Sequence, residues 1–326
     1  MRRTYGPGQP YTGMASDAMR LWKEHDERWN CRLFRQTGVL WMATAGDDQY
    51  ERASLPVLRE EGVWFEELSA AEMTRRWPQI NFEGVRWGIY EPDSGFLCAR
   101  TAGQEVVKGF VAEGGEYKQE AVLAKSEAEY QKGLQLSHGS KLVADQYVFA
   151  CGPWLGKLFP ETIGELIRPT KQDVFFFGVP AGDDRFSEAR LPVWADHRDR
   201  FVYGVPANDG RGFKIADDTR GPAFDPTSSE RTASAETLEV VREYVGFRFP
   251  AMKGAPLVET QVCQYENTPD DNFIMDRHPQ AENIWIVGGG SGHGFKHGPA
   301  IGEMVAELVM EGKHADAMFR LGRFRK

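Results

Sequence analysis

One stretch near the C-terminus constrains the fold of this chain more than any other. Residues 284–303 read IWIVGGGSGHGFKHGPAIGE, which is four apolar residues, a turn rich in glycine, and then an amphipathic run with a proline near its start. The pattern predicts a short buried strand, a glycine-rich turn and a helix. Such a turn lets backbone N–H groups approach an anionic or planar ligand, so we expect a ligand site here.

The remaining periodicity predicts an α/β protein. Helices are predicted over residues 15–30, 69–78, 101–113, 234–245 and 299–311. Strands are predicted over residues 37–44, 121–124, 141–142, 147–150, 171–180, 200–206 and 212–218. Helices and strands alternate toward both ends of the chain, while strands dominate its middle. This order predicts two intermixed domains, one a layered α/β domain and the other built on an aromatic-rich mixed sheet.

Composition argues against several classes of partner. The 326 residues carry a net charge of −9, which gives no basic field for nucleic acid. No apolar run approaches the roughly 20 residues that a membrane span needs. The four cysteines form no CxxC pair, so we expect no zinc site, and reduced thiols in a cytoplasm are the simplest interpretation. No nucleic-acid, membrane or metal partner is therefore expected.

Three stretches together resemble the sarcosine oxidase branch of the D-amino acid oxidase-like flavoproteins. They are GGGSGHGFKHGPAIGE (288–303), QVCQYENTPDDNFIMDRHP (261–279) and YVFACGPW (147–154). Weaker likeness continues through RRTYGPG (2–8), TGVL (37–40), RRWP (75–78) and EPDSGFL (91–97). The resemblance therefore spans nearly the whole chain in collinear order.

The resemblance implies a fold in two discontinuous parts. A Rossmann-type layered FAD-binding domain would comprise residues 1–37, 99–168 and 271–326, and a substrate domain with an antiparallel or mixed β-sheet would comprise 38–98 and 169–270. Such flavoproteins begin with a strand, a GxGxxG turn and a helix, and this sequence contains no strict GxGxxG. We expect that the chain starts after that unit, with about 40–50 residues absent. Either Met1 is an internal methionine taken as a start, or the gene is truncated.

The resemblance also assigns catalytic roles to three residues, Lys296, Tyr265 and Arg2, and attachment of the cofactor to Cys263. Lys296 would lie over the flavin, bind the substrate carboxylate and promote the reaction of reduced flavin with oxygen; a lysine is otherwise unfavourable at a helix N-terminus. Cys263 would attach the FAD through a thioether. Tyr265 would share a strand face with Cys263 and orient the substrate amine. Arg2 would pair with the substrate carboxylate.

Further residues would line the site. Tyr203 and Lys214 match cavity positions of the family, and Asp218 replaces a histidine, which favours a cationic amine or a larger polar substrate and puts N-methylglycine in doubt. The remaining residues that would contact FAD are Val122, Gly152, Gly290, Ser291, Gly292, His293, Gly294 and Phe295.

Each assignment has a plainer alternative. Lys296 would then be a surface lysine, Cys263 a structural thiol, Tyr265 a core side chain, Arg2 part of a frayed terminus and Asp218 the start of a loop. His293 fits either a hydrogen bond at the flavin edge or a structural role.

The predicted function is oxidation of a secondary or N-methylated amino acid by FAD held covalently through Cys263. Hydride would pass to flavin N5, the imine would hydrolyse, and oxygen would reoxidise the flavin to give hydrogen peroxide. A related oxidase for fructosyl or cyclic amino acids is one alternative, and a truncated, flavin-free, non-catalytic protein is another. We expect a cytoplasmic monomer or weak oligomer whose partners are the small amino acid and oxygen.

Overall fold

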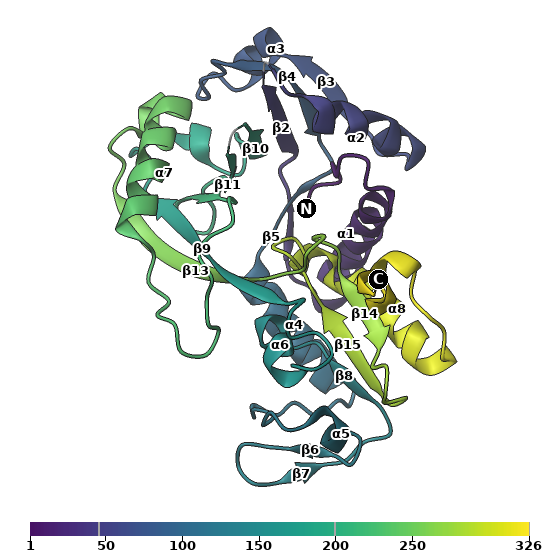
Figure 1. Ribbon diagram of the computed structural model, residues 1–326. Helices are drawn as coiled ribbons and strands as arrows, with labels where there is room; N and C mark the ends of the chain where they lie inside the picture. Colours follow the sequence, from purple (N-terminus) through teal and green to yellow (C-terminus); the bar gives the residue numbers. More distant parts are fainter. Residues whose placement is uncertain (45, 199, 326) are drawn as a thin grey trace. The chain divides into compact units, whose positions relative to one another are not determined.

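The computed structural model describes residues 1–44, 46–198 and 200–325 (Figure 1). These residues cluster into two units, each described here by itself. Unit 1 comprises Met1–Ala99, Gln172–Gly221 and Glu230–Cys263. Unit 2 comprises Arg100–Lys171, Pro222–Ser229 and Gln264–Lys326. The α/β fold class predicted from the sequence is confirmed, and in this division residues 1–37 belong to unit 1.

Unit 1 is built on a mixed sheet whose eight strands, within the described residues, follow the order β13-β9-β12-β11-β10-β2-β4-β3. Strands β10 and β2 pair in parallel, whereas β11 pairs with β10 and β12 in antiparallel fashion. The strands are β2 (Val39–Thr44), β3 (Glu66–Ser69), β4 (Val85–Glu91), β9 (Arg168–Phe177), β10 (Val193–His197), β11 (Phe201–Val205), β12 (Phe213–Asp217) and β13 (Leu257–Asn267). β9 and β13 have residues in both units.

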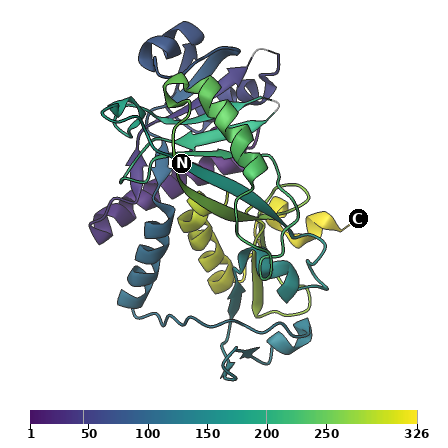
Figure 2. The same cartoon turned by 90° about the vertical axis from the view of Figure 1, so that its left-hand side faces the viewer.

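Helix α7 (Ala235–Arg248) covers one face of this sheet. Ser234 caps it by accepting a hydrogen bond from the backbone N–H of Thr237, as the sequence predicted. Val241 and Val245 pack against sheet residues such as Phe175. Figure 2 shows α7 (green) lying across the teal strands. The sequence pattern of a capped helix with one apolar side therefore produced the expected packing.

Helix α2 (Gln49–Glu60) packs on the opposite face, where Leu55 and Leu58 contact Trp41 and its neighbours. No helix was predicted here from the sequence, although the helix forms with Pro56 in its interior. The other helices and strands of unit 1 are α1 (Gln9–Trp29), α3 (Ala70–Arg76), the pair β1 (Phe34–Gln36) and β5 (Gly95–Leu97), and the short 3₁₀ helices η2 (Asp184–Phe186) and η3 (Pro250–Met252).

Unit 2 contains a three-stranded sheet in the order β14-β15-β8. β14 (Ile274–Arg277) is antiparallel to β15 (Ile284–Gly288), which is parallel to β8 (Tyr147–Phe149). The helices are α4 (Ala99–Ala112, from Arg100 onward), α5 (Glu127–Tyr130), α6 (Leu155–Leu158) and α8 (Gly298–Glu311), with 3₁₀ helices η1 (Gly152–Trp154), η4 (Phe295–His297), η5 (Ala317–Phe319) and η6 (Leu321–Phe324) and the hairpin β6 (Leu134–Gln135) and β7 (Lys141–Leu142).

The predicted strand–turn–helix at 284–303 is confirmed as β15, a turn with η4, and α8. α8 ends at Gly312, whose φ of 66° is the left-handed conformation that favours glycine. The strand predicted over 121–124 is wrong, because this segment makes a single bridge from Val122 to Leu136. Its flanks are largely exposed, so it buries too little apolar surface to extend the pairing.

Candidate active site

The first residues of the chain are held in unit 1 by a buried carboxylate. Glu91, at the end of β4, is fully buried. It accepts hydrogen bonds from the backbone N–H groups of Arg3 and Thr4, both at 3.0 Å, and from the hydroxyls of Thr4 and Ser94, both at 2.6 Å. Arg2 therefore begins from an anchored backbone and is not part of a frayed terminus.

The Arg2 side chain is itself fixed on several sides. Its guanidinium donates to the carbonyl of Thr4 and, at 3.3 Å, to the hydroxyl of Tyr50. The guanidinium carbon lies 4.2 Å from the ring centroid of Tyr5 and 4.8 Å from that of Trp41. Burial lowers the pKa of Arg2, but Tyr50, Tyr5 and Asp218 outweigh this effect and raise it overall. A half-buried, permanently charged guanidinium with a fixed plane suits a carboxylate ligand.

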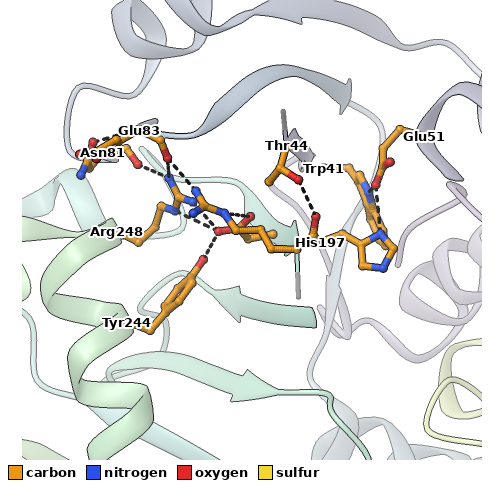
Figure 3. A network of polar contacts seen from close by, with 10 residues as sticks. Trp41, Thr44, Glu51, Asn81, Glu83, His197, Tyr244 and Arg248 are labelled. Atoms are coloured by element: carbon orange, nitrogen blue, oxygen red, sulfur yellow. Dashed lines mark hydrogen bonds and ion pairs between the residues drawn. The ribbon is translucent and has the colours of Figure 1, made fainter. Parts of the chain in front are cut away.

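Trp41 is held by a polar network on the sheet face that α2 covers. Its indole N–H donates to Oε1 of Glu51 at 2.6 Å, and His197 Nδ1 lies 3.3 Å from the same oxygen. Figure 3 shows Glu51 of α2 lying against Trp41 and His197 from the sheet. Glu51 is 1% exposed, so its interaction with the indole takes place out of water. Trp41, Glu51 and His197 were not identified as site residues from the sequence.

Four aromatic rings on this face form a row, which we call the aromatic stack: Tyr50, Trp41, Phe201 and Tyr203. Ring centroids are 5.5 Å apart from Tyr50 to Trp41, 5.2 Å from Trp41 to Phe201, and 6.2 Å from Phe201 to Tyr203. Strand register places Trp41 and Tyr203 on one face, because Ala195 pairs with both of them. The sequence located Tyr203 but not the other three, although the aromatic richness of 200–206 was visible.

Charged groups flank the stack. The ammonium of Lys214 lies 5.6 Å from the ring centroid of Tyr203, and burial lowers its pKa. Asp218 directly follows β12, and its N–H donates to the carbonyl of Phe201 at 2.7 Å. Residues 214, 216 and 218 alternate onto one face of the sheet. Unit 1 therefore brings together four of the predicted residues: Arg2, Tyr203, Lys214 and Asp218.

Cys263 is a free, half-buried thiol at the edge of the same face. It packs with Val174, Phe176 and Ala216. Burial raises the pKa of the Cys263 thiol, and the positive charge of Lys214 offsets part of that rise. A thiolate is the reactive form of cysteine, so Lys214 is placed to favour reactivity at this position.

Unit 2 contains the glycine-rich turn, and its backbone needs glycine at defined points. Gly289 and Gly292 have φ of 71° and 85°, and Ser291 has φ of 45°. A Cβ at Gly292 would overlap the ring of Tyr265, so the tyrosine packs directly on the turn. Tyr265 is thus brought together with Gly292, one of the predicted FAD contacts.

Lys296 lies in η4, just before α8. Its ammonium donates to the carbonyl of His293 at 3.0 Å, which stabilises the turn and fixes the amine at the helix entrance. The His293 ring stacks on Phe273 with centroids 4.8 Å apart, and its Nε2 lies 3.2 Å from the carbonyl of Asp271. Phe295 is half exposed. These contacts fit a structural contribution of His293 to the turn.

Glu266 of β13 contacts this turn, and it was not among the residues singled out from the sequence. Its Oε1 accepts the N–H of Gly290 at 3.1 Å, and its backbone carbonyl accepts the N–H of Ser291. Burial raises the pKa of Glu266, and the N–H groups of Gly290 and Gly289 offset part of the rise. A charged residue between Tyr265 and Asn267, inside an otherwise half-buried strand, was the available signal.

Two further predicted FAD contacts lie elsewhere in unit 2. Gly152 starts η1 shortly after β8 with φ of 55°, and apart from its chain neighbours no atom lies within 4 Å of where its Cβ would be. This leaves bare backbone at the carboxyl end of a parallel strand, where ligands bind in such sheets. Val122 is half-buried and lines a shallow pocket with Leu134, Leu136 and Leu142.

Comparison with known proteins decides the family, because a family described as FAD dependent oxidoreductase matches residues 2–308. The chain belongs to this family. It is 28% identical over 329 residues to monomeric sarcosine oxidase of Arthrobacter sp. (strain TE1826), covering 99% of this chain and 84% of the relative. It is 28% identical to N-methyl-L-tryptophan oxidase of Salmonella dublin, covering 99% and 86%. The resemblance to the sarcosine oxidase branch is thereby confirmed.

The fold agrees with solved structures of this kind. L-proline dehydrogenase from P. horikoshii superimposes with a TM-score of 0.87 at 20% identity, covering 99% of this chain and 85% of that one. By its family the protein is an FAD-dependent oxidoreductase, and residues present in each unit fit parts of that cofactor. In unit 2 Gly152 offers bare backbone, and in unit 1 Cys263 offers a free thiol.

Among the described residues, no helix is both long and apolar enough to cross a membrane. Nor do three or more His, Cys, Asp or Glu side chains gather as metal ligands in residues 1–44, 46–198 and 200–325.

Proposed function

We propose that this FAD-dependent oxidoreductase oxidises a secondary or N-methylated amino acid. The observation that carries the proposal is the fixed guanidinium of Arg2, beside the aromatic stack and in the same unit as Lys214 and Asp218. Cationic groups complement a carboxylate, and Asp218 complements an amine. Relatives named for sarcosine and N-methyl-L-tryptophan oxidation support this class of substrate.

The substrate carboxylate is bound by Arg2 of unit 1 in this proposal. The Arg2 guanidinium has its plane set by Tyr5 and Trp41, and a planar guanidinium suits two parallel N–H···O bonds to a carboxylate. In unit 2, the amine of Lys296 is tethered to the carbonyl of His293 and supplies a compact charge. The role of Lys296 in binding the carboxylate stays a prediction.

The substrate amine is complemented by the negative charge of Asp218 in unit 1. In unit 2, Tyr265 packs on Gly292, so its ring has a defined position on the turn. The role of Tyr265 in orienting the amine stays a prediction. When bound, FAD would supply an acceptor for the hydride that leaves the carbon next to nitrogen, and a route for its two electrons to oxygen, which is reduced to hydrogen peroxide. The imine is then hydrolysed by water. The chain's residues bind and orient the substrate, which is where much of the rate enhancement of such a site arises.

Covalent attachment of FAD through Cys263 is the finer part of the proposal. The thiol is free, burial raises its pKa, and the positive charge of Lys214 offsets part of that rise. A location in the cytoplasm and a monomeric or weakly associated state stay predictions.

A related oxidase for fructosyl or cyclic amino acids is a second candidate, and Asp218 is the observation that favours it. Asp218 follows β12, with its backbone N–H bonded to the carbonyl of Phe201, and its negative charge favours a cationic or larger polar substituent. A panel of sarcosine, N-methyl amino acids, proline and a fructosyl amino acid separates the two candidates.

The test is anaerobic reduction of the purified flavoprotein by each amino acid, with peroxide measured in air. We expect bleaching by N-methyl amino acids, and an Arg2→Leu variant should raise KM by about 10- to 100-fold, since a hydrogen bond to a charged group contributes about 1.5–3 kcal/mol. Acid denaturation should leave the flavin on the protein and release it from Cys263→Ser. Bleaching by none of the panel would overturn the proposal.

A further inference from the structure

Glu51 is a buried carboxylate on α2 that nothing in the proposed chemistry uses. It is 1% exposed, and its Oε2 has no hydrogen-bond partner among the described residues. Its Oε1 binds the indole N–H of Trp41 at 2.6 Å and lies 3.3 Å from Nδ1 of His197 (Figure 3). Burying a charged group is unfavourable unless hydrogen bonds compensate for the lost water. Glu51 lies on the sheet face that carries the aromatic stack, so its burial calls for a functional explanation.

We propose that Glu51 is a positioning residue for the carboxylate-binding Arg2, acting through the indole of Trp41. The inference rests on the proposed role of Arg2 in substrate binding. Its consequence is selective: disturbing Glu51 weakens ligands that carry a carboxylate and leaves ligands without one unchanged.

The first link runs from Glu51 to the ring of Trp41. A hydrogen bond from an N–H to an ionised oxygen is about twice as strong as a neutral one, and 2.6 Å is short for this kind. Rotation of the indole would break that bond inside a buried site. Tyr50 and Phe201 stack on the ring at 5.5 and 5.2 Å, so the ring plane is fixed on both counts.

The second link runs from Trp41 to Arg2. The guanidinium carbon lies 4.8 Å from the centroid of the indole ring, within the range of a cation–π interaction. Tyr50, which precedes Glu51 on α2, accepts a hydrogen bond from the same guanidinium at 3.3 Å. Residues 50 and 51 therefore set two of the surfaces that orient Arg2.

His197 belongs to the same network from the solvent side. Its side chain is 41% exposed, and its ring lies 6.2 Å from that of Trp41 and 5.5 Å from that of Tyr50. Since it shares Oε1 of Glu51 with the indole, it supports the position of the carboxylate. It is not needed for the link to Arg2, so its replacement should have a smaller effect than that of Glu51.

The test measures binding of (methylthio)acetate, which has a carboxylate and no oxidisable C–N bond, by its perturbation of the flavin absorbance spectrum. Glu51→Leu and Trp41→Phe should each raise the Kd about tenfold, because each removes the same hydrogen bond. The double variant should be no weaker than either single variant. Glu51→Gln keeps an acceptor oxygen and should recover most of the affinity.

Controls separate positioning from general damage. Glu60→Leu, an exposed position on α2, should leave the Kd unchanged. With an N-methylated amino acid as substrate, KM should rise in Glu51→Leu while kcat stays within about twofold of the wild-type value. The lost interaction binds the substrate and the transition state equally, so it does not change the rate of the bound complex. Dimethyl sulfide or a simple N-methyl alkylamine, which lack the carboxylate, should bind the wild type and Glu51→Leu with equal affinity.

The outcomes distinguish the inference from the proposal on which it rests. If Arg2→Leu binds (methylthio)acetate as well as the wild type does, the assignment of Arg2 fails and the inference fails with it. If Arg2→Leu weakens binding but Glu51→Leu and Trp41→Phe do not, the inference alone is overturned. Equal losses for ligands with and without a carboxylate would also overturn it.

Discussion

Replacing Asp196 by asparagine should expose how strongly unit 1 depends on one buried ion pair. Asp196 and Arg248 have side chains 1% and 0% exposed. Oδ2 of Asp196 accepts hydrogen bonds from Arg248 Nη2 at 2.6 Å, Arg248 Nε at 3.1 Å and the Tyr244 hydroxyl at 2.7 Å. Figure 3 shows Arg248 and Tyr244 of α7 in this network, with the carbonyls of Asn81 and Glu83 also accepting from the guanidinium.

The magnitude follows from burial. Asparagine has nearly the same shape but no charge, so the guanidinium of Arg248 stays buried without its counter-ion. Removing one partner of a buried pair costs about 3–5 kcal/mol. For a domain of about 150–250 residues, each kcal/mol lowers Tm by about 2–4 °C, so the expected fall is roughly 6–20 °C.

The assay is urea unfolding followed by circular dichroism, with thermal unfolding beside it. Glu66→Gln is the matched control, because Glu66 pairs with Arg76 on the surface and an exposed pair contributes about 0–1 kcal/mol. A loss in Asp196→Asn no larger than that in Glu66→Gln would refute the reasoning.

The same network predicts a pH dependence of stability. Burial, together with the negative charge of Asp196, raises the pKa of Tyr244 well above its ordinary value. The contribution of Tyr244 to the free energy of unfolding should therefore be complete below about pH 10 and fall as the pH rises above 10.

Two further predictions concern the glycine-rich turn. Gly292→Ala should destabilise unit 2 by about 1–3 kcal/mol and weaken flavin retention, because φ is 85° and the new methyl group meets the Tyr265 ring. Gly302→Ala, which places its methyl group in open space on α8, should leave stability unchanged. Equal Tm values for the two variants would contradict this prediction. Since burial raises the pKa of Glu266, stability should be complete below about pH 4 and decline as the pH rises through the raised pKa. Glu266→Gln should flatten that decline in urea unfolding between pH 4 and 7, whereas the exposed Glu282→Gln should keep the wild-type slope; identical slopes for Glu266→Gln and wild type would argue against it.

Local sequence was sufficient where the signal for an element lies within the element. Ser234 and Gly312 mark helix ends because a side-chain cap and a left-handed φ are properties of single residues. α2 was missed because Pro56 lies inside it and normally argues against a helix. The helix forms because Leu55 and Leu58 bury themselves against the sheet, a contact between distant segments.

By itself, the sequence determined the family, the glycine-rich turn and the chemical character of Arg2, Cys263 and Lys296, since these depend on residue types at short spacing. Tertiary structure alone decided which groups meet. The aromatic stack draws Trp41, Tyr50 and Phe201 from β2, α2 and β11, and the packing of α2 on the paired strands brings them side by side. It also decided that Glu51 lies beneath Trp41, because a buried carboxylate is stable only where distant hydrogen-bond donors converge on it.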